Sequence, residues 1–454
     1  MITTTRENER MKLTKIALAV AATAMVSTPV LATNGDNLIG LGAQSRALGG
    51  TGTAAYFGSE NALINPSLIG KGQGTEFVIG GTLFKPDVKA DTNVSDMTGQ
   101  RTYFSQTSDA DTNIIPEVSL STRLSDHWTF GLGIFGSAGM GTDYRDNAGY
   151  DDVDASAGVN GNGSALFNGY SNLQLMKFAP SLAYNNDRWG VGFAPVIQYG
   201  ALDINYKSYS AATTDVSNVG NGMSSDIGFG FNLGGHFDIT PDFTVALAYQ
   251  SAIDMEYKDQ ISVAAGGFGL NFDDNLEQPA EIKVGAAYTI GNLMLTADAK
   301  QIRWGQANGY KDFNWDDQNV FGIGAKYTRS NYWVGVGYNY GEDPIDKAGT
   351  GSTGDTPATG GMAGYQAQAV DLFNNHFFPA MVEQHFTFGG GYQLTKNLAL
   401  DGAIVYAPER SKTVDTGVVS SALGSSFAST ADAGTEHEVT HSQIGYTVSL
   451  RMNF

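Results

Sequence analysis

The sequence lacks cysteine and has few basic residues. Among its 454 residues there is no Cys, and 26 Lys and Arg stand against 46 Asp and Glu, which gives a formal net charge of −20. The lack of cysteine excludes thiolate metal sites, thiol catalysis and disulfide bonds. It also suits a chain that crosses an oxidising periplasm before it folds. The acidic balance argues against nucleic acid as a partner, because phosphate binding needs clustered Lys and Arg.

Charged residues of both signs are also scarce. They make up 16% of the chain, whereas about a quarter is usual in a soluble domain. In contrast, the chain has 58 Gly, 21 Tyr and 24 Phe, and 42% of its residues are hydrophobic. This hydrophobic content is too high for a disordered chain. The composition therefore favours strands that pack against lipid over a soluble enzyme.

Long hydrophobic runs are absent after residue 32. Before that point, a basic stretch at 11–15 precedes an apolar stretch at 16–26, which is too short to span a bilayer. We predict that residues 1–32 are a signal peptide, with Met1 or Met11 as the first residue made; an uncleaved anchor is the alternative. The mature chain, beginning near Thr33, is then periplasmic, secreted or an outer-membrane barrel.

Beyond about residue 75, apolar and mixed residues alternate with a period of two. In the final segment, every second residue from Tyr446 to Phe454 is apolar. Successive side chains of a strand point to opposite faces, so each segment has one apolar and one mixed face. The apolar face points inward in a soluble sandwich and toward lipid in an outer-membrane barrel. Alternation alone leaves both folds open.

The lengths of the connections distinguish these two folds. Short polar turns lie near Asp126, Asn186, Pro241, Gly291, Ser330 and Thr395. Between them are long polar loops, such as 87–113, 139–171, 341–384 and 408–441. Outer-membrane barrels alternate short periplasmic turns with long outer loops. Six turns and seven loops predict an all-β fold: a transmembrane outer-membrane β-barrel of about 14 antiparallel strands at residues 74–454.

The tryptophans and the last residue fit the same layout. Trp128, Trp189 and Trp333 each follow a short turn, and Trp304 and Trp315 flank a longer loop. Tryptophans at strand ends form the aromatic girdles of a barrel, so we expect these residues there. The chain ends on an aromatic residue in the apolar register, which is the usual feature that the barrel-assembly machinery recognises. We therefore expect that machinery as a partner.

The segment before the first strand has no alternation. It contains a small-residue run with Gly49, Gly50 and Gly52, followed by Asn65-Pro66-Ser67. This segment resembles the N-terminal hatch of the FadL/TodX family of outer-membrane transporters, in which a Gly-rich run precedes an Asn-Pro-Ala box. Ser67 stands where the family has Ala. Asn65 also suits the N-cap of a short helix that has Pro66 in its first turn. We assign residues 33–73 to this hatch.

The resemblance extends over the barrel, for example in 180–192, 279–304 and 338–344. It implies a hatch-plugged barrel for passive uptake of long-chain fatty acids or of aliphatic or aromatic hydrocarbons. The ligand would bind an apolar pocket above the hatch and leave sideways through the wall. Such a ligand gains roughly 0.8 kcal/mol per buried CH₂, which a water-filled porin does not offer. We expect a monomer in the bacterial outer membrane, in contact with membrane lipids and lipopolysaccharide.

Four cations are candidates for contact with the ligand. Lys283, Lys300, Lys326 and Arg451 fall on the mixed faces of their strands and should point into the lumen. A cation in the lumen can hold the carboxylate of a fatty acid. Ion networks that support the hatch are the alternative for each of them.

Three glycines are candidates for a lateral gate. Gly131, Gly133 and Gly136 lie in the third predicted strand, where the family opens its wall at a kink. Glycine permits such a kink, because strands bend most easily where there is no side chain. The alternative is that these are ordinary glycines of a barrel strand with no role in a gate.

Motifs of enzymes and metal sites are missing. Gly-x-Ser-x-Gly and His-Glu-x-x-His do not occur, and His437 and His441 alone have a ligand-like spacing. We predict that the protein is not an enzyme and that it has no metal site and no cofactor. A general polar-solute porin and a loop-based adhesin or receptor barrel are the alternative functions. The hatch favours a transporter, because open porins narrow their lumen with a loop.

Overall fold

The structure is a computed structural model that describes residues 33–95, 101–145, 168–210, 215–348, 364–417, 419 and 436–454. Every structural statement below concerns these residues. The signal peptide predicted at residues 1–32 lies outside them, as do parts of the four long loops.

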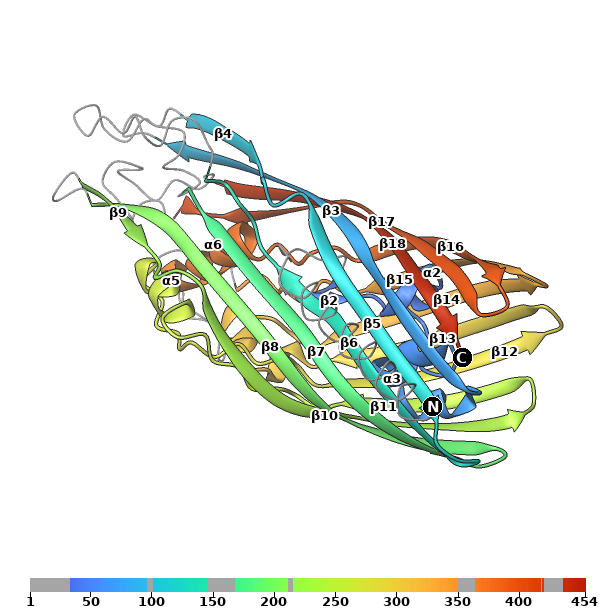
Figure 1. The fold of residues 1–454 in the computed structure, drawn as a ribbon. Coiled ribbons are helices and arrows are strands. Elements are labelled where there is room, and N and C mark those ends of the chain that lie inside the picture. Colours follow the sequence, from blue (N-terminus) through green and yellow to red (C-terminus); the bar gives the residue numbers. More distant parts are fainter. Residues whose placement is uncertain are drawn as a thin grey trace, which may run out of the picture.

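Fourteen strands of the described chain close into one antiparallel barrel (Figure 1). They are β3 (Thr75–Ser95), β5 (Asn113–Arg123), β6 (Trp128–Met140), β7 (Tyr170–Asn185), β8 (Trp189–Ser210), β10 (Ser224–Thr240), β11 (Phe243–Gln250), β12 (Glu281–Ile290), β13 (Leu293–Ile302), β14 (Gln318–Arg329), β15 (Tyr332–Gly341), β16 (Gln384–Thr395), β17 (Leu398–Asp415) and β18 (Glu436–Asn453). β18 pairs with β3 and closes the barrel. Two more strands, β4 (Arg101–Thr107) and β9 (Asp215–Val219), pair with the outer ends of β3 and β8. The predicted fold and strand number are confirmed.

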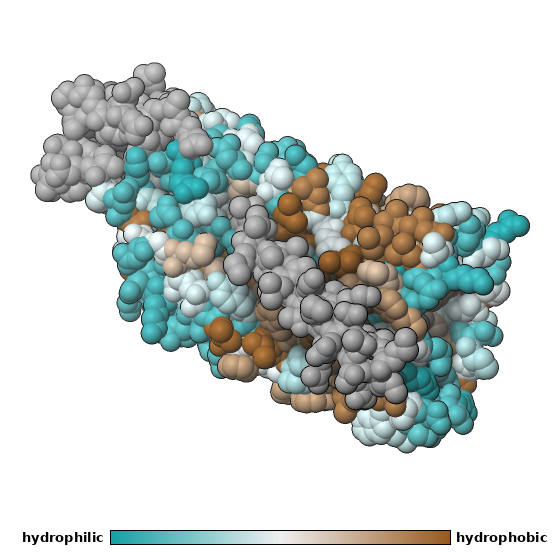
Figure 2. Space-filling view, in the orientation of Figure 1, coloured by the Kyte–Doolittle hydropathy of each residue, from teal (hydrophilic) through white to brown (hydrophobic). Residues whose placement is uncertain are grey.

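The apolar faces of the strands form the outer surface of the barrel. On β18, Tyr446, Val448 and Leu450 are exposed, whereas Thr447 and Ser449 between them are buried. Figure 2 shows hydrophobic residues gathered over the middle of the barrel and hydrophilic residues at both ends. An exposed apolar band excludes the soluble sandwich and fits a wall that faces lipid.

The five tryptophans divide between the outer surface and the interior. Trp128 and Trp189 are 43% and 39% exposed beside the short turns, as predicted for a girdle. The prediction was wrong for Trp304, Trp315 and Trp333, which are buried. Trp304 and Trp315 belong to a loop that packs into the barrel, and Trp333 points into the lumen. Spacing along the chain places a residue near a strand end, but it does not fix the face.

The N-terminal segment, residues 33–73, lies inside the barrel. It forms β1 (Thr33–Asn34), β2 (Asn37–Leu38), α2 (Gly42–Ala47), η1 (Gly58–Glu60), α3 (Asn61–Ile64) and η2 (Pro66–Lys71). α2 packs against β16 and β17, and η2 packs against β7, β8 and β10, so the segment reaches across the lumen. The Asn65 side chain accepts the N–H of Ser67 (3.1 Å), and Pro66 opens η2, as the box predicted.

Three outer loops carry further helices. The β11–β12 loop contains α5 (Ile261–Gly267), the β13–β14 loop contains η3 (Trp304–Gln306) and η4 (Tyr310–Phe313), and the β15–β16 loop contains α6 (Gly364–Phe377). All three loops contribute to one buried apolar cluster together with lumen-facing strand residues. None of the helices described is both long enough and apolar enough to cross a membrane.

Candidate functional site

A window interrupts the barrel wall between β5 and β6. The pairing of these strands ends at Glu117 and Phe135, although both strands continue beyond this point. Pro116 is the first residue of β5 beyond this point, and it pairs with Gly81 of β3 but not with β6. Because proline has no N–H to donate to a neighbouring strand, it gives a local reason for the ladder to end.

The same two segments meet again closer to the outer loops. Asp109 N donates to Asp143 O (2.8 Å), and Asp143 N donates to Ser108 Oγ (2.9 Å). The gap is therefore bounded at both ends. We call it the window and define it by residues 110–116 and 136–142.

A strand of the N-terminal segment occupies the window. Asn37 of β2 pairs with Ala138 of β6, and Gly139 N donates to Asp36 O (3.1 Å). In this stretch β2 takes the place that β5 has elsewhere along β6. The closure of the wall here depends on a segment that is not part of the barrel.

A second interruption lies between β7 and β8. The pairing is lost after Phe178 opposite Ile197 and resumes at Leu182 opposite Phe193. Pro180 and Pro195 lie in the unpaired stretch. Because regular pairing resumes on both sides, this interruption is short, and no strand of the N-terminal segment enters it.

The three glycines predicted as a lateral gate have different surroundings. A Cβ added to Gly131 or Gly133 would lie 3.5 Å from Ala62 Cβ, so both face the N-terminal segment. Gly136 lies where the register between β6 and β7 shifts, and an added Cβ would lie 2.7 Å from Ile115 Cγ2. Gly136 is thus at the edge of the window. Gly131 and Gly133 leave space for the N-terminal segment.

A polar cavity lies between the N-terminal segment and the inner wall. Its lining includes Lys177 of β7, Lys283 and Glu281 of β12, and Lys300 of β13. Lys283 Nζ forms an ion pair with Glu281 Oε2 (3.0 Å). Asp298 also lines the cavity, but its Oδ2 accepts bonds from the N-terminal segment. Cations therefore outnumber carboxylates here, which suits an anionic group.

The other two predicted cations line a different cavity, nearer the short turns. Lys326 donates to Gln44 Oε1, and its Nζ lies 5.0 Å from the ring centre of Trp333. Arg451 Nε forms an ion pair with Asp401 Oδ2 (2.9 Å). The structure therefore brings Lys283 and Lys300 together but not Lys326 and Arg451. Of the latter pair, Lys326 bonds to the N-terminal segment, whereas Arg451 bonds to Asp401 of β17.

The small residues of the N-terminal segment contact the wall through their main chain. Gly52 N and Thr53 N both donate to Asp298 Oδ2, at 2.9 Å each. Gly49, Gly50 and Gly52 have φ angles of +68°, +74° and +151°. Side chains are disfavoured at such angles, so the glycines allow the segment to turn tightly against the strands.

The box of the N-terminal segment faces the opposite wall. Ser67 Oγ lies 3.0 Å from His236 Nδ1 of β10. Asn65 Nδ2 donates to Thr53 O (2.7 Å), which joins the box to the small-residue run. Ser in place of Ala thus adds a hydrogen bond between the segment and the barrel.

Aromatic side chains of the outer loops fill the lumen on the outer side of the N-terminal segment. Trp304, Tyr310 and Trp315 pack against one another with ring centres 4.6 to 5.0 Å apart. Phe313 stacks on Phe373 of α6 at 5.1 Å. A ligand that enters this region meets apolar and mainly aromatic surfaces.

Asp36 joins the aromatic region to the polar cavity. Its Oδ2 accepts the hydroxyl of Tyr310. Burial raises the pKa of Asp36 to about 7; the Tyr310 hydrogen bond and the Lys177 ammonium oppose this shift, and the Glu281 carboxylate adds to it. The carboxyl thus changes its charge near neutral pH, beside the strand that fills the window.

Comparison with known proteins identifies the family. Residues 19–359 match the outer membrane protein transport family described as OMPP1/FadL/TodX. The chain belongs to this family. It is therefore an outer-membrane transporter of hydrophobic compounds, from a family of transporters and not of enzymes. The long-chain fatty acid transport protein of Escherichia coli O6:H1 is 26% identical over 392 residues, which cover 74% of this chain and 83% of that protein.

Solved structures of similar proteins share the barrel. A FadL homologue of Pseudomonas aeruginosa has a TM-score of 0.65 at 14% identity, covering 92% of this chain and 100% of that one. The toluene transporter TodX of P. putida has a TM-score of 0.62 at 18% identity, covering 92% and 99%. The toluene transporter TbuX of Ralstonia pickettii has a TM-score of 0.58 at 20% identity, with the same coverage. At these identities the likeness shows the fold.

Three residues of this site were not predicted from the sequence. Pro116 carried a usable signal, because proline inside an alternating segment marks an edge or an interruption. Lys177 is 2% exposed and lies on the lumen face, but its segment alternates too weakly to fix the face. Asp36 carried no signal, since its neighbours come from distant loops.

Proposed function

We propose that this protein takes up hydrophobic molecules passively and releases them sideways through the window. The observation that carries the proposal is the end of the β5–β6 pairing at Glu117 and Phe135, with β2 as the closure. Displacement of Asn37 from Ala138 would leave an opening in the wall without breaking any bond between barrel strands. A ligand could then move from the lumen into the membrane without entering water.

The physical chemistry of the ligand supports this route. An acyl chain or hydrocarbon gains free energy from apolar contacts, and the aromatic region around Trp304 and Phe373 offers them. The window lies beside the same region, because Ala138 and Met140 belong to the same apolar cluster. A sideways exit keeps the ligand in apolar surroundings throughout.

We propose long-chain fatty acids as the substrate class, with neutral hydrocarbons as the second candidate. Lys177, Lys283 and Lys300 line one cavity beside the aromatic region, and only Lys283 is ion-paired there among the contacts described. A carboxylate is the group that such a cavity would hold. The name of the E. coli relative supports a fatty acid, and those of TodX and TbuX support a hydrocarbon.

We also propose that residues 33–73 act as a hatch that seals the lumen. A barrel of this size is too wide to be filled by its own strand side chains, since diameter grows with strand number. The segment reaches from β16 and β17 across to β8 and β10, and its described residues are mostly buried. Lipopolysaccharide and the barrel-assembly machinery remain predicted partners.

A disulfide across the window tests the exit route. Asn37 of β2 is paired directly with Ala138 of β6, so a disulfide between these two positions would hold β2 in the window. Because the protein has no cysteine, the variant Asn37→Cys/Ala138→Cys contains only the designed pair. We expect the oxidised variant to lose uptake of labelled oleate in cells, and reduction to restore it.

A matched pair elsewhere in the wall provides the control. A Cβ on Gly445 would lie 4.0 Å from Val405 Cβ, between β18 and β17, which are regularly paired there. The oxidised Val405→Cys/Gly445→Cys variant should transport normally. If the closed window leaves uptake unchanged, the substrate leaves by another route and the lateral exit is wrong. Mass spectrometry of lipid that copurifies with gently extracted protein then identifies the substrate class.

A further inference from the structure

Three aromatic residues of the β13–β14 loop contact both the strand in the window and the helix of the outer opening. We call Trp304, Tyr310 and Trp315 the triad. Each is at most 3% exposed, and each ring packs against the other two. Because interiors are close-packed, one ring of such a group cannot move far while the others stay.

On one side the triad holds the residues next to β2. The Tyr310 hydroxyl donates to Asp36 Oδ2, and the main-chain O of Asp36 accepts from Gly139 of β6. Gly35 lies directly on the Trp304 indole: an added Cβ would lie 2.6 Å from Cζ2. Asp36 therefore accepts both the bond from Gly139 that helps to close the window and the bond from Tyr310 of the triad.

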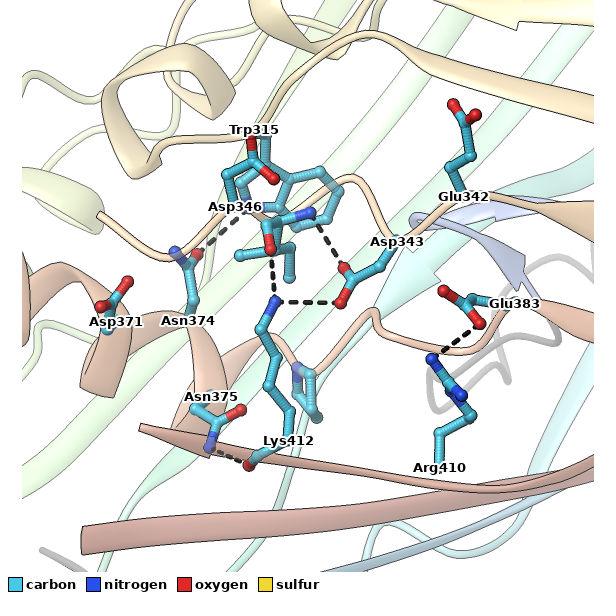
Figure 3. A network of polar contacts seen from close by, with 12 residues as sticks. Trp315, Glu342, Asp343, Asp346, Asp371, Asn374, Asn375, Glu383, Arg410 and Lys412 are labelled. Carbon is cyan, nitrogen blue, oxygen red and sulfur yellow. Dashed lines mark hydrogen bonds and ion pairs between the residues drawn. The ribbon is translucent and has the colours of Figure 1, made fainter. Parts of the chain in front are cut away.

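On the other side the triad holds α6. Trp315 Nε1 donates to Asn374 Oδ1 (3.1 Å), as Figure 3 shows. Asn374 Nδ2 donates to Phe313 O (2.7 Å). Both polar atoms of the Asn374 side chain thus bond to the β13–β14 loop. Phe373, its neighbour in α6, stacks on Phe313.

The C-terminal end of α6 is in turn bonded to the barrel strands near the outer loops. Asn375 Nδ2 donates to Lys412 O (3.0 Å), and Lys412 Nζ donates to Asp343 Oδ2 (3.0 Å), as Figure 3 shows. Thr142 Oγ1 donates to His376 O (2.8 Å). α6 lies at the loop end of the barrel (Figure 1) and covers the aromatic region with Phe373. A ligand that enters at the loop end would therefore meet α6.

We propose that the triad locks α6 and β2 to each other, so that the outer opening and the window open together. This inference deepens the proposed function and rests on its lateral exit. A ligand that inserts between the rings would separate Trp315 from Asn374 and Tyr310 from Asp36 in one movement. Coupling of this kind is a free energy shared by two sites, and it acts equally in both directions.

Thiol labelling in the absence of substrate tests the coupling in both directions. Two reporters are placed singly in the cysteine-free protein: Ala138→Cys at the window, which is 3% exposed, and Ala369→Cys in α6, which is 0% exposed. Trp315→Phe removes the bond to α6, and Tyr310→Phe removes the bond to Asp36. We expect each substitution to speed N-ethylmaleimide labelling of both reporters about fivefold, the factor expected for one lost hydrogen bond.

Trp128→Phe is the matched control, because it makes the same substitution at an exposed tryptophan beside the short turns. It should leave both rates unchanged, and the heat-dependent gel shift of each variant reports that the barrel is folded. The proposal is overturned if Trp315→Phe affects only the reporter in α6, if Tyr310→Phe affects only the one at the window, or if neither has an effect. The disulfide across the window reports separately on the exit route. Coupled labelling with uninhibited uptake would therefore refute the lateral exit and leave the lock in place.

Discussion

Replacement of Asp298 by Ala should loosen the hatch without damage to the barrel. In the native protein, Oδ2 of Asp298 accepts the N–H groups of both Gly52 and Thr53 at 2.9 Å. Alanine leaves these two donors without an acceptor. Each unsatisfied donor costs about 1–3 kcal/mol, so the docked state loses about 2–6 kcal/mol. Since 1.4 kcal/mol is about a factor of ten, the undocked population should rise at least about thirtyfold.

Planar-bilayer conductance measures this change. We expect frequent openings to ions in Asp298→Ala, and a steady open pore when residues 34–70 are deleted. Asp298→Asn is the control, because it keeps an acceptor oxygen in place, and it should behave almost like the native protein. The reasoning is refuted if Asp298→Ala and the deletion are both as closed as the native protein. The loops would then make the seal, and the assignment of residues 33–73 as the hatch would be wrong.

Three further predictions concern the cavity, the window and β6. Lys177→Met and Lys300→Met should each raise the KM for oleate uptake about tenfold, because each removes a charge-assisted bond to the carboxylate. Uptake of an n-alkane should be unchanged. Equal losses for both substrates would exclude a head-group site. Asp36 binds its proton more tightly when docked, because burial raises its pKa from 3.8 to about 7. Asp36 thus stabilises the docked N-terminal segment below pH 3.8, and this stabilisation is lost as the pH rises toward 7. The thiolate fraction itself rises with pH, so the labelling rate of Ala138→Cys is divided by that of the exposed reference Tyr103→Cys at the same pH. This ratio should be higher at pH 8 than at pH 5, and Asp36→Asn should remove that difference. Gly131→Val should press on Ile69 and raise ion conductance, whereas Gly402→Val, where an added Cβ meets only Thr447 O at 3.4 Å, should not; equal effects would refute a specific contact of Gly131 with the hatch.

The sequence was sufficient to predict the barrel because its determinants are local. A period of two assigns each side chain to a face, and turn lengths assign each connection to an end. The same rule placed Lys283, Lys300, Lys326 and Arg451 on the lumen face. It could not give their height along the barrel, which depends on strand stagger. For this reason the four cations were treated as one set, although they line two cavities.

The aromatic girdle shows where local patterns stop being sufficient. Trp128 and Trp304 both lie near strand ends, yet one is 43% exposed and the other is 0% exposed. Trp304 is buried because Gly35, more than 250 positions away in the chain, leaves space for its ring. A contact of this kind joins the first described segment to a late loop, and no short window of sequence contains both partners. The triad and Asp36 were missed for the same reason.

The link between the hatch and the barrel limits how the hatch can move. η2 ends at Lys71 and β3 begins at Thr75, beside the seam where Thr75 N donates to Phe454 O (3.3 Å). The three residues between them span at most about 10 Å when extended. Any movement of the proposed hatch would therefore be smallest near Lys71, beside the β3–β18 seam, and could increase toward Thr33. β2, which fills the window, is far along the chain from this seam, so a small rotation of the proposed hatch would displace it more than η2.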